Sequence, residues 1–208
     1  MTPKQIYDQI YHYIGNKNTI ICNLHSACSP IIGKNYICGI PKTKTNIINF
    51  DSVKEKVDSG NNPRKSVDAI VNSPSNSFFC FIEMKSWNLF LTYNGTEENI
   101  HEQAKKYKSD LPEKLAKSIE ICKDIIDNES IFENCKILYI LLADIPIKTD
   151  KNSEVSSIDY ALTALAGTSS NLKVQLCNQL SREIMDNIPD IETRYWECTN
   201  FDAELSKL

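Results

Sequence analysis

The segment KSVDAIVNSPSNSFFCFIEMK, residues 65–85, decides the fold. Its two apolar runs, 65–71 and 78–85, predict two β-strands, and the turn-forming residues between them predict an antiparallel hairpin. The second run is apolar at odd and even positions alike, which is typical of a central strand that is covered on both faces. We therefore expect a sheet built around residues 78–85, with further elements packed above and below it.

The elements on either side of this hairpin indicate an α/β domain. Helical spacing of apolar residues predicts helices over 3–14, 97–127, 156–166 and 171–187, with Pro112 expected to kink or divide the long one. Short β-prone runs predict strands over 19–24, 35–40, 45–50, 136–143 and 194–199, and 51–65 is a polar stretch with a strong turn signal at 59–63. This order predicts a mixed β-sheet flanked by helices. We expect a single domain over 1–208, with its core at about 45–145 and a helical decoration over 150–208.

Composition excludes several classes of protein. The chain has 208 residues, of which 41% are hydrophobic and 24% charged, so neither a disordered nor a fibrous protein is a reasonable interpretation. It contains no apolar run of the length that a membrane-spanning helix needs, and the start of the chain lacks the continuous apolar stretch of a secretory signal. We therefore expect a cytoplasmic protein with no membrane association, whose eight cysteines are mainly reduced core residues.

Charged side chains in the hairpin give the first indication of chemistry. Because side chains alternate along a strand, Glu83 and Lys85 should project from one face, and hairpin pairing should bring Asp68 beside Glu83. Carboxylates at the end of a buried strand are costly unless they are paired, hydrated or bound to a metal. A hard divalent cation such as Mg²⁺ would relieve the repulsion between two carboxylates and supply the chemistry of phosphodiester hydrolysis.

This arrangement, Asp68 followed on the next strand by Glu83-x-Lys85, resembles the signature of the PD-(D/E)XK nuclease superfamily. Gln103-Ala104-Lys105-Lys106-Tyr107 in the following helix is similar to the Q-x-x-x-Y motif of its RecB-like branch, although no proline precedes Asp68. The resemblance implies a restriction-endonuclease-like core in which Asp68, Glu83 and the backbone carbonyl of Met84 bind Mg²⁺ or Mn²⁺. It further implies that Lys85 is catalytic and that Gln103 supports the site or the substrate backbone.

The expected partner is nucleic acid, with DNA first. The net charge is −4, but residues 34–65 carry seven Lys and Arg against three Asp and Glu, and an uneven distribution matters more than the sum. The residues expected to contact the nucleic acid are Lys42, Lys44, Lys54, Lys65, Lys105 and Tyr107, with Lys106 and Lys108 beside them. Restriction, phage defence and repair are the roles that the resemblance implies, and a homodimer is a possible arrangement.

Other interpretations of the same residues stay open. The cluster at Asp68, Glu83 and Lys85 could be a structural ion pair in a catalytically silent nuclease-like domain that binds nucleic acid or a protein partner, with the acidic carboxyl-terminal part as its surface. A third reading takes Cys22, His25, Cys28 and Cys38 as ligands of a zinc-stabilised module. If Asp68 and Glu83 repel each other without metal, Glu83→Gln should raise the melting temperature.

Overall fold

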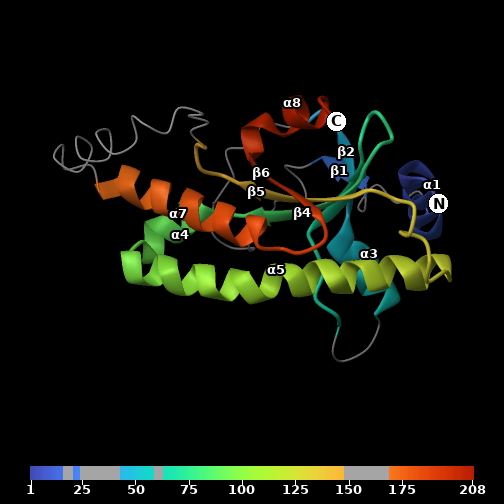
Figure 1. The fold of residues 1–208 in the computed structure, drawn as a ribbon, viewed down its shortest axis with the longest axis horizontal. Helices are drawn as coiled ribbons and strands as arrows, with labels where there is room; N and C mark the ends of the chain where they lie inside the picture. The colour runs from blue at the N-terminus through green and yellow to red at the C-terminus, as the bar shows by residue number, and fades with distance from the viewer. Residues whose placement is uncertain (16–20, 24–42, 59–62, 148–168) are drawn as a thin grey trace.

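The structure is a computed structural model that describes residues 1–15, 21–23, 43–58, 63–147 and 169–208. Strands and helices alternate along most of the chain (Figure 1). The elements are α1 (Pro3–Ile14), β1 (Ile21–Asn23), β2 (Asn46–Asn49), α3 (Phe50–Val57), β3 (Ala69–Asn72), β4 (Phe79–Lys85), α4 (Trp87–Asn94), α5 (Glu97–Ile126), β5 (Ile137–Ala143), α7 (Ser169–Asp186), β6 (Glu192–Glu197), a 3₁₀ turn (Cys198–Asn200) and α8 (Phe201–Leu205).

Six strands form one sheet whose spatial order follows the chain, β1-β2-β3-β4-β5-β6. The pairs from β1 to β4 are antiparallel, whereas β4, β5 and β6 run parallel. The connection between β3 and β4 is short enough only for a hairpin, while β4 reaches β5 through the long helix α5, which is the crossover that a parallel pair requires. The expected mixed sheet flanked by helices is confirmed.

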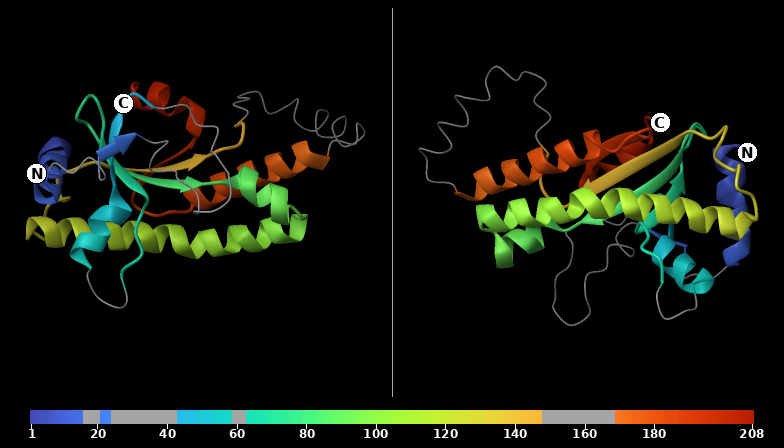
Figure 2. Two further views of the ribbon diagram at one scale, coloured as in Figure 1. Left: turned by 180° about the vertical axis from the view of Figure 1, so that it is seen from behind. Right: turned by 60° about the horizontal axis from the view of Figure 1, so that its bottom comes forward.

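The two faces of β4 explain its unbroken run of apolar residues. Phe79 and Phe81 point into a core that also contains residues of α1, α3, α5 and α7. Cys80 and Ile82 point into a second core, which α8 and Trp196 of β6 complete. The figures show α5 along one face of the sheet and α8 on the other (Figures 1 and 2). Glu83 and Lys85 continue the odd-numbered series and therefore lie on the α5 side.

Helix α5 is one continuous element. Pro112 was expected to kink or divide it, and the structure shows that it does not divide it. The helix begins after Thr96, whose side chain accepts a hydrogen bond from the Asn99 N–H, and ends at Asp127 in the left-handed region with φ 54°. Leu111 and Leu115, on either side of the proline, are buried in the core. Tertiary packing on both sides therefore outweighs the cost of one proline in the helix.

The remaining expectations differ from the structure at several boundaries. Helix α3 occupies part of the stretch 51–65 that was expected to be polar loop; Asn49 caps it, and Phe50 and Val53 anchor it in the core. Helix α4 was not predicted, and the last strand lies at 192–197 instead of 194–199. The strand expected at 65–71 is shorter and begins at Ala69. The elements expected at 35–40 and 156–166 lie outside the described residues.

The sheet extends past the core expected at about 45–145, because β1 and β6 also belong to it. No helix in the described ranges is both long and apolar enough to span a membrane.

Candidate active site

The hairpin places the Asp68 carboxylate against the end of β4. Ala69 pairs with Ile82 in the sheet, and the Asp68 N–H still donates to the Ile82 carbonyl at 3.0 Å. One step further along β4, the Asp68 side chain replaces the backbone as acceptor, and its Oδ2 receives the Met84 N–H at 2.5 Å. The carboxylate is therefore held in register with Glu83 by the strand backbone itself.

Glu83 is the buried centre of the site. Its side chain is 0% exposed, and its Oε1 accepts hydrogen bonds from Lys85 Nζ at 2.5 Å and from Lys114 Nζ at 2.7 Å. The other oxygen, Oε2, is buried and has no hydrogen-bond partner in the described part of the chain. An acceptor left in this state costs free energy, and such groups often mark a place that a water or ion completes.

Lys114 of α5 links the two acids. Its Nζ lies 2.7 Å from Glu83 Oε1 and 4.0 Å from Asp68 Oδ1, so a single cationic group reaches both carboxylates. The structure thus brings together the expected residues Asp68, Glu83 and Lys85. It adds a second lysine, which the sequence analysis missed.

The pKa values of the cluster reflect burial and mutual repulsion. Burial, and then the neighbouring Glu83 carboxylate, raise the pKa of Asp68 to about 7, against the opposing effects of Lys114 and the Met84 N–H. Burial lowers the pKa of Lys85, but attraction to Glu83 outweighs this and the pKa is raised overall. A carboxylate such as Asp68, whose ionisation is opposed by burial and by a neighbouring carboxylate, gains from an added cation.

Tyr107 and Gln103 lie on the same side of the cluster, as the Q-x-x-x-Y spacing predicted. Lys85 Nζ stands 4.5 Å from the centroid of the Tyr107 ring, in the range of a cation–π contact. Trp87 packs edge-on against this ring at 5.4 Å, and the Gln103 side chain is hydrogen-bonded to Tyr107. The Tyr107 ring, which contacts Trp87 and Gln103, therefore limits the position of Lys85.

Ser118 ties helix α5 to the strand that carries Asp68. Its buried hydroxyl accepts the Val67 N–H at 2.9 Å and donates to the Lys114 carbonyl at 2.8 Å. The regular ladder with β4 begins only after Asp68, because the Met84 N–H goes to the Asp68 side chain and the Asp68 carbonyl accepts the Phe50 N–H at 2.9 Å, which explains the shortened β3. Lys114 and Ser118 follow Tyr107 by about two and three helical turns and therefore lie on the same face of α5. Polar residues on this buried face were a signal in the sequence that could have indicated both as site residues.

Two of the lysines expected to contact nucleic acid are engaged with acids in the structure. Lys65 pairs with Asp110 at 2.9 Å and Glu113 at 2.7 Å, and Lys54 pairs with Asp51 at 2.9 Å. Lys44 is exposed and its backbone N–H donates to Asp202 at 2.7 Å, whereas Lys42 lies outside the described residues. Two of the positive charges counted in residues 34–65 are therefore already neutralised by acids.

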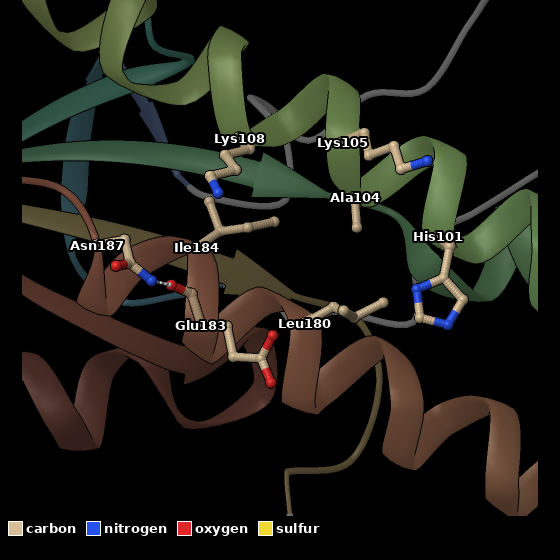
Figure 3. Close-up of a pocket in the computed structure, with 8 residues that line it drawn as sticks. All are labelled: His101, Ala104, Lys105, Lys108, Leu180, Glu183, Ile184 and Asn187. Atoms are coloured by element: carbon tan, nitrogen blue, oxygen red, sulfur yellow. Dashed lines mark hydrogen bonds between the residues drawn. The ribbon is translucent and has the colours of Figure 1, made fainter.

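Lys105 lines a groove between α5 and α7 instead (Figure 3). The groove is lined by His101, Ala104, Lys105 and Lys108 of α5 and by Leu180, Glu183, Ile184 and Asn187 of α7. Two residues along a helix correspond to about 200° of rotation, so Lys105 and Tyr107 point in nearly opposite directions. A nucleic acid that contacts the carboxylate cluster would need to bend around α5 to reach Lys105.

The donor atoms of the cluster suit a hard cation better than a soft one. Two carboxylates and the proposed carbonyl of Met84 are oxygen ligands, and Mg²⁺ commonly takes few protein ligands and keeps several waters. No group of three His, Cys, Asp or Glu side chains suited to a metal is found among the described residues. Of the zinc candidates, His25, Cys28 and Cys38 lie outside the described ranges, as does the side chain of Cys22.

The contacts of Asp68, Glu83, Lys85 and Lys114 given above all join residues within the described ranges. Comparison with protein-family models, with curated proteins and with solved structures finds no match for this chain.

Proposed function

We propose that the protein is a metal-dependent nuclease with a restriction-endonuclease-like core, of the PD-(D/E)XK type and nearest in pattern to its RecB-like branch. One observation carries the proposal: Asp68 and Glu83 are both within reach of one ammonium group, with Lys85 beside them and a buried Glu83 oxygen that lacks a partner. The buried Glu83 oxygen without a partner costs free energy that a bound ion would recover, and clusters of charges with perturbed pKa values are frequent at functional sites.

The residues present fit a magnesium or manganese ion. Asp68 and Glu83, with the backbone carbonyl of Met84, would hold it, and the unpartnered Glu83 Oε2 is the atom with most to gain. When bound, such an ion polarises a phosphodiester, lowers the pKa of a water and neutralises charge on the leaving oxygen.

Lys85 supplies the fixed positive charge of the proposed reaction. Its raised pKa keeps the ammonium protonated near neutral pH, because the Glu83 carboxylate outweighs the effect of burial. Contact with the Tyr107 ring and the Glu83 carboxylate limits where the Nζ can go. A charge held in this way stabilises negative charge that develops on the phosphate, and needs little rearrangement to do so.

DNA is the proposed substrate, in a restriction, phage-defence or repair role, on analogy with the fold type alone. The proposed path for the substrate keeps only part of the contacts expected from the sequence. Lys65 and Lys54 are already paired with acids, and the Lys44 N–H is bonded to Asp202 of α8, on the other face of the sheet. Of the expected lysines, the exposed Lys106 of α5 is therefore the better candidate for a contact.

A second candidate function is a catalytically silent domain that binds nucleic acid or a protein. The observation that favours it is charge balance: two ammonium groups, from Lys85 and Lys114, already face two carboxylates. A cluster of this kind can persist as a structural ion-pair network without any metal.

Hydrolysis assays separate the two functions. We would incubate the protein with plasmid, linear DNA, single-stranded DNA and RNA, in Mg²⁺, Mn²⁺ or EDTA. The nuclease predicts cleavage that EDTA stops and that Glu83→Gln and Lys85→Ala abolish, because both groups act mainly on the transition state. Lys117→Ala and Glu120→Gln are matched controls, since these exposed residues pair with each other on the same helix at 2.9 Å. Cleavage by Glu83→Gln at the wild-type rate would rule out this site.

A further inference from the structure

We propose that Lys114 is an internal counter-cation, which neutralises the metal-free site and competes with a divalent metal for Asp68 and Glu83. Lys114 would therefore set the metal affinity of the protein. This inference rests on the proposed function, because it assumes that Asp68 and Glu83 are metal ligands.

The first support is the position of Lys114 between the acids. Its Nζ is 2.7 Å from Glu83 Oε1 and 4.0 Å from Asp68 Oδ1, which are the two side chains proposed to hold the metal. A divalent ion among these oxygens would stand within a few ångströms of the ammonium, and like charges at that distance repel strongly in a partly buried site. The ammonium and the metal thus compete for the same carboxylates.

The second support is that Lys114 is held less firmly than Lys85. Both donate to the same Glu83 oxygen, but Lys85 also stands against the Tyr107 ring at 4.5 Å. Lys114 comes from another element, helix α5, and keeps 22% of its side chain exposed, somewhat more than the 15% of Lys85, so it has a route to solvent. When a metal adds positive charge, Lys114 is the lysine that can leave.

The third support is an alternative partner for the departing ammonium. Asp110 lies one helical turn before Lys114 on α5, the spacing at which an acid and a following lysine pair on a helix surface. Its carboxylate is 41% exposed and already receives Lys65 at 2.9 Å. Lys114 can thus exchange a buried carboxylate for an exposed one, which keeps the displacement reversible.

The test measures metal binding directly, by calorimetric titration of Mn²⁺ into the purified protein. Lys114→Met removes the competing charge and should bind Mn²⁺ about tenfold more tightly than the wild type, a modest effect for two groups in direct contact. Lys114→Arg keeps the charge and should stay within a few-fold of the wild type. Lys117→Met, the same change one turn further along α5, should leave the affinity unchanged.

A second pair of variants leaves Lys114 in place and tests the outward position. Asp110→Asn removes the acceptor for the displaced ammonium and should weaken Mn²⁺ binding. Glu113→Gln is its control, because Glu113 also pairs with Lys65, at 2.7 Å, but lies next to Lys114 in sequence and not one turn away. This pair keeps the test decisive if Lys114→Met does not fold.

The outcomes separate the inference from the proposed function. If the wild type binds Mn²⁺ and folded Lys114→Met binds it equally or more weakly, Lys114 is not a competing cation, while the metal site stands. If Asp110→Asn and Glu113→Gln bind alike, the outward position is wrong. If no folded variant binds Mn²⁺, the inference and the proposed metal site both fail.

Discussion

Replacing Glu83 by glutamine is the most direct test of the electrostatics of the site, because this one carboxylate holds two ammonium groups. The side chain is fully buried, and its Oε1 receives Lys85 at 2.5 Å and Lys114 at 2.7 Å. Removing one partner of a buried ion pair typically destabilises a protein by about 3–5 kcal/mol. Relief of the repulsion with Asp68 returns part of this, so we expect metal-free Glu83→Gln to lose roughly 2–3 kcal/mol.

This expectation reverses the one drawn from the sequence, where only the like-charge pair was visible and the substitution should have raised the melting temperature. Urea unfolding in EDTA near neutral pH measures the change in the free energy of unfolding. For a chain of this size the same loss lowers the melting temperature by roughly 5–10 °C. Glu120→Gln, an exposed acid of α5 that pairs, within the described residues, only with Lys117 of the same helix, controls for the substitution itself. A Glu83→Gln protein as stable as the wild type would refute the two-lysine account.

Three further predictions concern the groups around Glu83. The pKa of Asp68 is raised from 3.8 to about 7, so between these pH values the folded state keeps a proton that the unfolded state has lost. The free energy of unfolding of the metal-free protein should therefore fall as pH rises through that window. Asp68→Asn should flatten the slope of the urea midpoint against pH. Ser118→Ala leaves the buried Val67 N–H without its acceptor and should cost about 1–3 kcal/mol by urea unfolding, with Mn²⁺ bound more weakly because Asp68 is less firmly placed. Tyr107→Phe keeps the ring against Lys85 and should retain most cleavage, whereas Tyr107→Leu should lower the maximal rate at saturating DNA; equal rates would remove the cation–π contact from the account.

Local pattern was enough for the hairpin and for the core of the site. The run 78–85 is apolar on both faces and then charged, and alternation alone places Glu83 and Lys85 on one side. The helix α5 was also visible, from its apolar spacing. Its proline was over-weighted, because the burial of Leu111 and Leu115 that holds the helix together is a tertiary effect.

The features that the local sequence pattern did not predict, helix α3 and the role of Lys114, depend on which elements pack together. Helix α3 has eight residues, and its core contacts, Phe50, Val53 and Val57, are separated by charged residues and followed at once by the turn signal at 59–63, which made the whole stretch resemble a loop. Lys114 joins the site only because α5 crosses beside the end of the hairpin, where Ser118 fixes it to Val67. Spacing from Tyr107 could have put Lys114 on the buried face, but not against Glu83.

Charge counted along the sequence was misleading for a related reason. Lys65 counts as a free positive charge within residues 34–65, yet Asp110 and Glu113, the acids that neutralise it, come from α5. The ion pairs that remove Lys65 from a nucleic-acid surface also connect the segment before Asp68 to the helix that carries Lys114. Charge reversal at Lys65 should therefore disturb the alignment of hairpin and helix as well as any binding. A loss of nucleic-acid affinity in such a variant would identify a phosphate contact only if Mn²⁺ affinity and unfolding free energy stayed at wild-type values.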